Sequence, residues 1–377
     1  MSSFTLSPVP EIRFGAGRLA DIGPIAQARA GAGAVALLVA DPALKGQGIT
    51  GLAQELLAKA GVGSHVYDGF TAEPSVADID AATALARRHG AGTVIGLGGG
   101  SALDTAKLAA CCAVTGLDAS AYALCATPLP QNRLPVIAVP TTAGTGSEVT
   151  RVSVYADANK AKVWAWGEEL KPDVAILDPE LTVGVPPAVT AGTGLDALVH
   201  AIEAATNKQA NPGNDLYCLE AIRLIAANLA RAVTHPDDLA ARGAMLLASC
   251  YGGIGIDNCG TALAHNISHA LANLAAMPHG RATGLAMLAT MDWVAEGNRS
   301  AFSRVAQAMG RDDPVVAFDR IVRASGIVVA PGLESVTPEA LAAQMAAPAN
   351  APMRKSTLRY PTDGDLVMLA GRFLALA

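Results

Sequence analysis

The sequence predicts two domains, an N-terminal α/β domain with a doubly wound parallel sheet and a C-terminal all-helical domain. In the first half of the chain, short apolar runs typical of buried strands alternate with helical segments. After about Gly184 the strand pattern ends and one helical segment follows another. The length of 377 residues suits two or three domains of about 150 residues each. We place the boundary in the proline-bearing region 181–187, so that the predicted domains are residues 1–183 and 184–377.

Each expected strand ends in residues that form turns or bind ligands. The apolar runs stop at Asp-Pro, at three consecutive glycines or at Pro-Thr-Thr. In a doubly wound sheet, ligands bind beyond the carboxyl ends of the strands, which is where these segments fall. The expected strands are 34–40, 93–97, 136–139 and 174–177, and the helices of the first half include 51–60 and 76–89. The helices expected in the second half are 189–206, 215–234, 236–252, 261–274, 284–295 and 298–309.

Composition and charge exclude several classes of protein. With 51% hydrophobic and 16% charged residues, the chain has ample material for buried cores and is not disordered. The 27 basic and 33 acidic side chains give a net charge of −6, which provides no electrostatic footprint for nucleic acid and no polybasic face for a membrane. No stretch of about 18 apolar residues is free of charged or turn residues, so no membrane span is expected.

The cysteines and the N-terminal residues indicate a cytoplasmic location. The six cysteines are scattered and form no C-x-x-C pair, so they do not describe a disulfide framework. The segment Met1–Leu6 lacks the charged-then-apolar layout of a secretion signal. We therefore expect an enzyme or binding protein of the reducing cytoplasm.

Two loops at strand ends are typical of phosphate and ribose binding. The segment Gly98–Lys107 (GGGSALDTAK) follows an expected strand and opens an expected helix, where glycines let a phosphate approach the free N–H groups. It is not G-x-G-x-x-G, and the alternative is a tight turn without a ligand. The segment Pro140–Thr150 (PTTAGTGSEVT) offers many hydroxyls, which suit either a cofactor or a helix cap. Asp41, after the first strand, suits a ribose 2′-hydroxyl and repels a 2′-phosphate, unless it is only a turn residue.

Histidines and one aspartate in the helical half predict a metal site. Asp196 and His200 are spaced i,i+4 on an expected helix, and His265 and His269 repeat this spacing on a later helix, with His279 ten residues further on. One carboxylate and three imidazoles suit Fe²⁺, Zn²⁺ or Mn²⁺. The spacing does not choose between His265 and His269 as the ligand. Several polar groups on alanine-rich helices are costly to bury unless they share a partner.

The motifs together resemble those of the iron-containing (group III) alcohol dehydrogenase family. The resemblance runs over nearly the whole chain, and it implies the dehydroquinate synthase-like fold, in which a dinucleotide-binding α/β domain precedes a helical metal domain. The matching motifs are GGGSxxDxxK at Gly98–Lys107, TTxGT at Thr141–Thr145, DPxL at Asp178–Leu181, DxxxH at Asp196–His200 and HxxxH…PHG at His265–Gly280.

The resemblance also implies roles for individual residues. Asp196, His200, His265 and His279 become the metal ligands, and His269 becomes a non-ligand near the nicotinamide that relays a proton. Asp41 matches a position where an acid favours NAD over NADP. The other residues implied to contact the cofactor are Gly99, Gly100, Ser101, Asp104, Thr141, Thr142, Thr145, Lys162 and Leu181.

The expected reaction is reversible hydride transfer between a short alcohol and NAD or NADP, with Fe²⁺ as the metal and Zn²⁺ as its alternative. A maleylacetate reductase-like or hydroxyacid-oxoacid transhydrogenase-like oxidoreductase and a dehydroquinate synthase-like lyase are the alternatives. The chain has Arg281-Ala282 where the family has Asn-Ala after Pro-His-Gly, a departure that concerns the substrate rather than the metal. A small apolar pocket favours neutral aldehydes, whereas Arg151 or Arg281, pointing inward, would anchor a carboxylate. Pairing of Phe4–Phe14 with a second copy predicts a homodimer.

Overall fold

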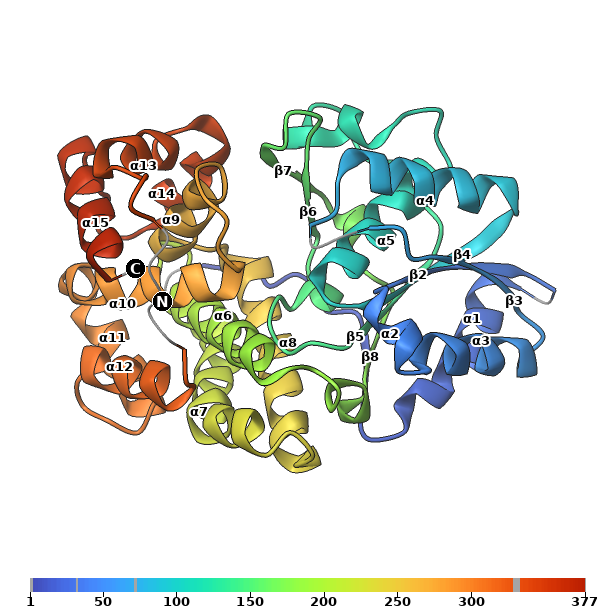
Figure 1. Ribbon diagram of the computed structural model, residues 1–377, viewed down its shortest axis with the longest axis horizontal. Helices are drawn as coiled ribbons and strands as arrows, with labels where there is room; N and C mark the ends of the chain where they lie inside the picture. The colour runs from blue at the N-terminus through green and yellow to red at the C-terminus, as the bar shows by residue number, and fades with distance from the viewer. Residues whose placement is uncertain (1–2, 32, 71–72, 328–332, 377) are drawn as a thin grey trace. The chain divides into compact units, whose positions relative to one another are not determined.

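The computed structural model describes residues 3–31, 33–70, 73–327 and 333–376, and these divide into two compact units. One, which we call the α/β unit, comprises Pro8–Thr142 and Ser147–Gly184. The other, the helical unit, comprises Met1–Ser7, Ala143–Gly146 and Val185–Ala377. The units are therefore interleaved in sequence near the threonine-rich loop. Figure 1 shows the elements of both.

The α/β unit is built on a six-stranded sheet in which every strand pair is parallel. The strand order is β1-β8-β5-β4-β2-β3. Because all these strand pairs are parallel, the carboxyl ends of the strands lie at one edge of the sheet. The strands are β1 (Glu11–Phe14), β2 (Val35–Ala40), β3 (Gly63–Tyr67), β4 (Ala91–Gly98), β5 (Val136–Pro140) and β8 (Val174–Leu177).

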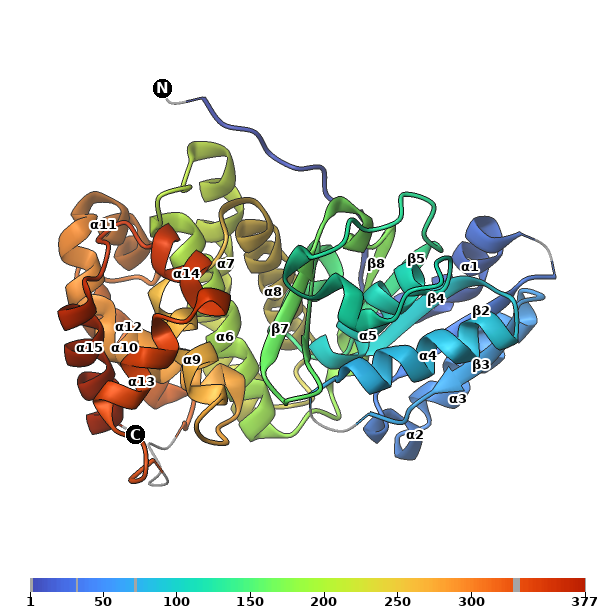
Figure 2. The same cartoon turned by 90° about the horizontal axis from the view of Figure 1, so that it is seen from above.

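Helices cover both faces of this sheet, which explains why its strands are apolar throughout. Along β2, Leu38 packs with Ile22 and Leu57 in one apolar cluster, whereas its neighbour Leu37 packs with Ile79 in another. Alternate side chains of a strand point to opposite faces, so both clusters are filled by a single apolar run. Figure 1 shows the two helical layers, which are α1 (Ile22–Ala30) with α3 (Ile49–Lys59), and α4 (Val76–Arg88) with α5 (Gly100–Cys112). In Figure 2 the layer of α4 and α5 lies nearer the viewer.

An antiparallel hairpin in the α/β unit was not expected from the sequence. Its strands are β6 (Val152–Ala156) and β7 (Lys162–Trp166), and their connection contains Lys160 at a φ of 64°. The short alternating pattern lacks Asn-Gly or Asp-Gly at the turn, which is the main sequence signal for a hairpin. The remaining short elements are η1 (Arg18–Asp21), α2 (Ala43–Gly46), η2 (Ala119–Cys125), η3 (Ser147–Val149), η4 (Glu168–Leu170) and η5 (Pro179–Thr182).

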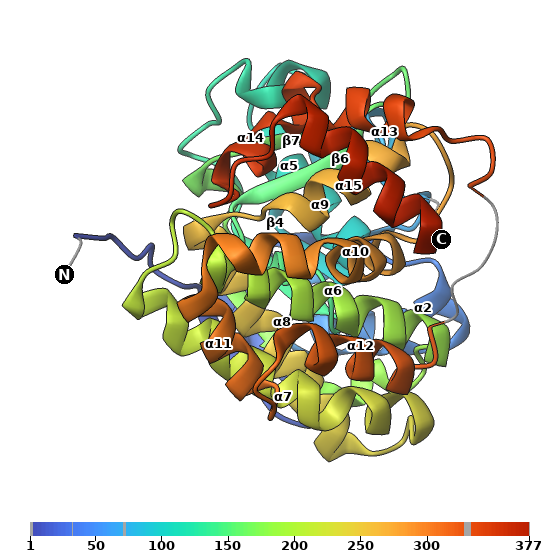
Figure 3. The ribbon, with the colours of Figure 1, turned by 90° about the vertical axis from the view of Figure 1, so that its left-hand side faces the viewer.

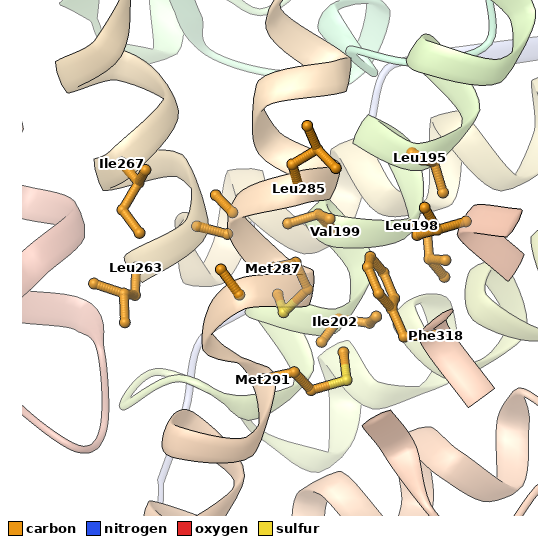
Figure 4. Close-up of a cluster of buried hydrophobic side chains, with 14 of the residues drawn as sticks. Leu195, Leu198, Val199, Ile202, Leu263, Ile267, Leu285, Met287, Met291 and Phe318 are labelled. Atoms are coloured by element: carbon orange, nitrogen blue, oxygen red, sulfur yellow. The ribbon is translucent and has the colours of Figure 1, made fainter. Parts of the chain in front are cut away.

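The helical unit packs its helices around a single apolar cluster (Figures 3 and 4). In this cluster Leu198 and Ile202 of α6 meet Met291 of α10 and Phe318 of α12. The helices are α6 (Pro187–Thr206), α7 (Pro212–Thr234), α8 (Leu239–Cys259), α9 (Leu263–Ala272), α10 (His279–Gly297), α11 (Arg299–Ala308), α12 (Pro314–Ala324), α13 (Pro338–Met345), α14 (Ala351–Ser356) and α15 (Asp363–Leu376), with the 3-10 turn η6 (Pro348–Asn350).

Helix α8 is long and apolar enough to cross a membrane by length and composition alone, and 67% of that stretch is buried. Its apolar character therefore fits a core helix of the helical unit. Arg242 in its first turns is hydrogen bonded within the unit, to Thr190 and to two backbone carbonyls.

Three local expectations differ from the structure. Helix α10 begins at His279, five residues earlier than expected, so this histidine lies in a helical first turn. Helix α8 extends to Cys259 instead of ending at Gly252. Residues Glu11–Phe14 of the N-terminal segment form an edge strand that pairs with β8 of the same chain.

Candidate metal and cofactor site

Helix α6 places three acidic or imidazole side chains along one buried face. Asp196, His200 and Glu203 follow one another at i, i+4 and i+7, and their exposed fractions are 2%, 5% and 2%. Residues at these spacings lie on the same side of a helix. The rest of the helix is mostly Ala, Leu, Val and Ile, so this is a polar stripe within an apolar core.

Helices α9 and α10 bring two further histidines to Asp196. The Nε2 atoms of His265 and His279 each lie 3.6 Å from Asp196 Oδ1. Ligand atoms of Asp196, His265 and His279 all lie within 4.8 Å of one another. The ring of His200 stacks on that of His265, with 4.5 Å between the centroids. The structure thus brings all four predicted metal ligands together.

The Nδ1 atoms of these histidines are held by protein groups. His265 Nδ1 lies 2.6 Å from Glu203 Oε2, His279 Nδ1 lies 3.0 Å from Ser268 Oγ, and His200 Nδ1 lies 3.3 Å from the carbonyl oxygen of Gly144. A metal-bound imidazole generally uses its other nitrogen for such a bond, which sets the ring orientation and the tautomer. The arrangement therefore fixes these rings, and the Nε2 atoms of His265 and His279 face Asp196.

Two buried atoms at the centre lack a hydrogen-bond partner among the described residues, namely Asp196 Oδ1 and His265 Nε2. Buried polar atoms are rarely left unpaired, because removing them from water without a partner costs free energy. The carboxylate oxygen and the imidazole nitrogen face each other at 3.6 Å. Both are atoms that coordinate divalent cations. The donor set fits a metal ion.

Glu203 is a member of the site that the sequence reasoning missed. Its carboxylate accepts hydrogen bonds from the backbone N–H groups of Ala262, Ala264 and His265, besides the contact with the His265 ring. Glu203 therefore holds both the start of α9 and the orientation of its histidine. Its position one turn after His200, on the face of Asp196, was the available signal.

Charge within the cluster shifts the pKa values of its members. Burial raises the pKa of Asp196, but the imidazoles of His200 and His279 outweigh burial and bring it far below its usual range. Burial also opposes charge on His265, but Glu203 and Asp196 outweigh it and raise the pKa of His265 to about 9. Burial lowers the pKa of His200. Two carboxylates among three imidazoles give the cluster the negative charge that attracts a cation.

His269, the predicted proton relay, lies next to this cluster at the end of α9. Its ring centroid is 5.3 Å from that of His279 and 6.2 Å from that of His265. Its ring is partly exposed, unlike that of His265. These positions suit a group that exchanges protons with solvent.

In the α/β unit, the glycine-rich turn and α5 form the predicted phosphate-binding element. Gly98 has a φ of 151°, and a Cβ there would lie 2.9 Å from both Asp41 Cβ and Ala102 Cβ. Gly99 is the N-cap of α5 without a capping side chain, and Gly100 and Ser101 form the first turn. The N–H groups at such a helix start bind anions.

The other predicted cofactor residues have varied surroundings. Asp41 Oδ1 accepts a hydrogen bond from the N–H of Ala43, which is a turn-forming contact. Lys162 begins β7, and its Nζ lies 3.6 Å from Glu73. Thr142 Oγ1 lies beside Gly99, Thr141 is buried after β5, Leu181 is buried under the sheet, and Thr145 falls within the helical unit.

Asp104 is tied into a buried polar network. Its carboxylate accepts hydrogen bonds from Lys107 Nζ (3.2 Å), Ser147 Oγ (2.5 Å) and the N–H of Val154 (2.9 Å). Lys107 is fully buried and also donates to Thr150. Asp104 therefore joins α5 to the threonine-rich loop and to β6 through protein contacts.

A glycine-rich strand-to-helix turn in a doubly wound sheet is typical of dinucleotide-binding proteins, and a buried carboxylate–histidine cluster is typical of metal-dependent enzymes. Residues 9–179 match the model of the family "Iron-containing alcohol dehydrogenase", and residues 190–323 match "Fe-containing alcohol dehydrogenase family, C-terminal". The chain belongs to the iron-containing alcohol dehydrogenase family.

Individual relatives agree with this assignment. The chain is 41% identical over 309 residues to a probable alcohol dehydrogenase, EutG, of Escherichia coli, covering 81% of this chain and 77% of the relative. A crystal structure of 1,3-propanediol oxidoreductase matches with a TM-score of 0.88 and 31% identity, over 99% of this chain and all of the other. Sulfoacetaldehyde reductase from Bifidobacterium kashiwanohense, solved in complex with NAD⁺, matches with a TM-score of 0.91 and 29% identity over 100% of both chains.

These findings confirm the predicted family, the fold class and the class of activity. The protein is an oxidoreductase of the iron-containing alcohol dehydrogenase type.

Proposed function

We propose that the chain interconverts a short alcohol and its aldehyde at a metal held by Asp196, His200, His265 and His279. The observation that carries this proposal is the pair of unpartnered buried atoms, Asp196 Oδ1 and His265 Nε2, among imidazoles whose Nδ1 atoms are already bonded. We take Fe²⁺ as the resident metal and Zn²⁺ as its competitor, because an aspartate with three imidazoles binds both.

We assign different ligands to the two parts of the chain. Residues 1–183 bind the dinucleotide, and residues 184–377 bind the metal and the substrate. The start of α5, with Gly99, Gly100 and Ser101, binds the diphosphate through backbone N–H groups. The further cofactor contacts that we propose are those of Asp41, Thr141, Thr142, Thr145, Lys162 and Leu181, with Asp104 supporting the loop.

The bound metal supplies Lewis acidity toward the substrate oxygen, and the nicotinamide cofactor accepts or donates the hydride. The residues of the chain hold and orient these partners. Glu203 keeps the His265 ring turned so that its Nε2 faces Asp196. His269 transfers the alcohol proton from the site to solvent through its imidazole nitrogens, since an imidazole can both accept and donate a proton.

The cellular setting completes the proposal. We place the enzyme in the cytoplasm, because the six cysteines are free thiols in the structure and five of them are buried. We propose a homodimer formed through the open side of the edge strand β1, which carries exposed Phe14.

The test follows NADH absorbance at 340 nm with a panel of short aldehydes, on protein reconstituted anaerobically with Fe²⁺ or Zn²⁺ and on chelated protein. We expect NADH oxidation that depends on the metal. Activity that survives complete metal removal would contradict the metal mechanism and favour a metal-independent reductase. NADH binding without turnover of any substrate would leave the fold assigned and the reaction wrong.

A further inference from the structure

Arg281, in the first turn of α10, is partly buried, and two of its three guanidinium nitrogens lack a hydrogen-bond acceptor among the described residues. Its Nε and Nη2 atoms are both buried, and neither has a hydrogen-bond partner in the part of the chain that the structure describes. The residue follows the metal-site residue His279 by two positions.

Two other arginines of the chain interact with protein groups that Arg281 lacks. All three nitrogens of Arg242 are bonded, to the Pro236 carbonyl, to Thr190 Oγ1 and to the Val185 carbonyl. Arg151, the other arginine considered as a carboxylate anchor, pairs with Glu168 and lies 4.6 Å from the centroid of the Trp166 ring. Arg281 is therefore the one of the two candidate anchors whose charge the described protein groups do not neutralise.

The surroundings of Arg281 add positive rather than negative potential. Helix α10 begins after Pro278 without a capping side chain and without an acidic residue in its first turn, and α6 begins after Pro186 in the same way. The two helices approach closely there, since a Cβ on Gly280 would lie 2.2 Å from the carbonyl oxygen of Gly192. Helix N-termini favour negative charge, so both add to the attraction of the guanidinium for an anion.

We propose that Arg281 binds an anionic group of the substrate, a carboxylate or sulfonate, while the aldehyde oxygen of the same molecule faces the metal site that includes His279. This inference rests on the proposed function. The planar fork of a guanidinium matches two oxygens of such a group, and both buried nitrogens, Nε and Nη2, lie on one edge of that fork. The substrate class is then a short aldehyde with a negative charge at its far end, reduced to the corresponding hydroxy acid or hydroxysulfonate.

The diphosphate of the cofactor also offers anionic oxygens to which Arg281 could bind. The experiment distinguishes binding of the diphosphate from binding of the substrate. The variants are Arg281→Gln and Arg281→Lys, with Arg320→Gln as a control at an exposed arginine of the helical unit. For each, kcat/KM is measured with NADH for sulfoacetaldehyde and succinic semialdehyde and for the neutral propanal and butanal. The Kd of NADH for metal-free protein is measured by fluorescence.

We expect Arg281→Gln to lower kcat/KM about 10- to 100-fold for the anionic aldehydes, as for a lost charged hydrogen bond, and to leave the neutral aldehydes and the NADH Kd unchanged. Arg281→Lys retains the charge without the fork and falls between wild type and Arg281→Gln. A weakened NADH Kd with an equal loss for every aldehyde would assign the guanidinium to the diphosphate and overturn the substrate assignment. Equal kinetics of Arg281→Gln and Arg320→Gln would also overturn it.

A direct binding measurement separates failure of this inference from failure of the proposed function. Calorimetric titration of metal-free wild type and Arg281→Gln with 4-hydroxybutyrate and isethionate requires no turnover. Binding that Arg281→Gln loses would support the anion site even if no aldehyde in the panel reacts. No binding to wild type, together with turnover of neutral aldehydes only, would overturn the inference and leave the dehydrogenase assignment intact.

Discussion

Two buried aspartates, one in each unit, have opposite surroundings. Asp104 of the α/β unit accepts hydrogen bonds from a lysine, a serine and a backbone N–H group. Asp196 of the helical unit lies among imidazoles, and its Oδ1 atom has no hydrogen-bond partner among the described residues. We call the network of Asp104 closed, because its carboxylate has hydrogen-bond partners within the protein. We call the cluster of Asp196 open, because it contains buried atoms without such a partner among the described residues.

The difference separates support of the fold from ligand binding. A buried charge with a full set of protein partners is electrostatically satisfied, so removing one partner destabilises the fold. In a buried cluster with unpaired atoms, the missing partner is an external ion. Removing a residue of such a cluster should therefore affect ion binding more than folding. The same contrast distinguishes Arg242, which is fully bonded, from Arg281.

The largest effect is expected for His279→Ala, which removes a donor from the open cluster. We expect loss of stoichiometric metal and a loss of activity greater than the roughly 100-fold upper range for residues that act only behind a metal ligand. Metal content after dialysis and kcat/KM are measured, with circular dichroism to check folding and His235→Ala as an exposed control. Stoichiometric metal in His279→Ala would exclude His279 as a ligand.

The closed network is tested by Asp104→Ala. This change leaves Lys107 fully buried without its counter-charge, so we expect a loss of about 3–5 kcal/mol in the free energy of unfolding, measured in urea. Metal content should stay at the wild-type level. Adding Lys107→Met should recover much of the lost stability, and a loss below about 1 kcal/mol in the single variant would show that the network is not a closed ion pair.

Glu203→Gln tests the link between folding and binding in the helical unit. An amide keeps an oxygen for the N–H groups of α9 but removes the charge that orients His265, so metal affinity should fall about 10- to 100-fold. Competition with a chelating dye measures the affinity, with Glu220→Gln as the exposed control. A lower melting temperature with unchanged metal affinity would reduce Glu203 to a cap of α9.

Glu148 is a buried carboxylate in the α/β unit that resembles Asp196 in having an oxygen without a protein partner among the described residues. It differs in that protonation, rather than an ion, can remove its charge. Burial raises its pKa from 4.5 to about 7, and its Oε1 atom has no partner among the described residues. Between pH 4.5 and 7 the unfolded chain releases this proton while the folded chain retains it, so the folded state loses stability as pH rises.

Glu148→Gln should therefore stabilise the protein, by an amount on the order of 1–2 kcal/mol at pH 8. The gain should be absent below pH 4.5, grow up to about pH 7 and stay constant above it. Urea unfolding at several pH values measures this difference. A gain that does not change with pH would show that the carboxylate is not the titrating group.

The smallest effect is expected for Asp41→Gly, because one oxygen of this carboxylate already accepts a hydrogen bond within its own turn. Oδ1 of Asp41 accepts a bond from Ala43, so only part of its charge remains available to a ribose. We expect the kcat/KM ratio of NADPH to NADH to rise roughly three- to tenfold, equivalent to about 0.6–1.4 kcal/mol. An unchanged ratio would mean that Asp41 serves only the turn.

The sequence predicted the elements whose cause is local. Apolar runs with turn residues at their ends located β2, β4, β5 and β8 but not β3, whose residues are only partly buried or exposed, and i,i+4 spacing placed Asp196 with His200. The start of α10 was missed because Pro278 serves as its N-cap without a Ser, Thr, Asp or Asn side chain. The β6–β7 hairpin was missed because its connection lacks the usual turn residues.

The sequence by itself determined the fold class and the family and predicted candidate metal ligands, because periodicity and short motifs are properties of the chain alone. Tertiary structure decided which buried polar groups have partners within the protein and which do not. Glu203 meets His265 across 62 positions, and Asp104 meets Val154 across 50. Such pairings depend on how helices and strands pack, and no spacing within one element reports them.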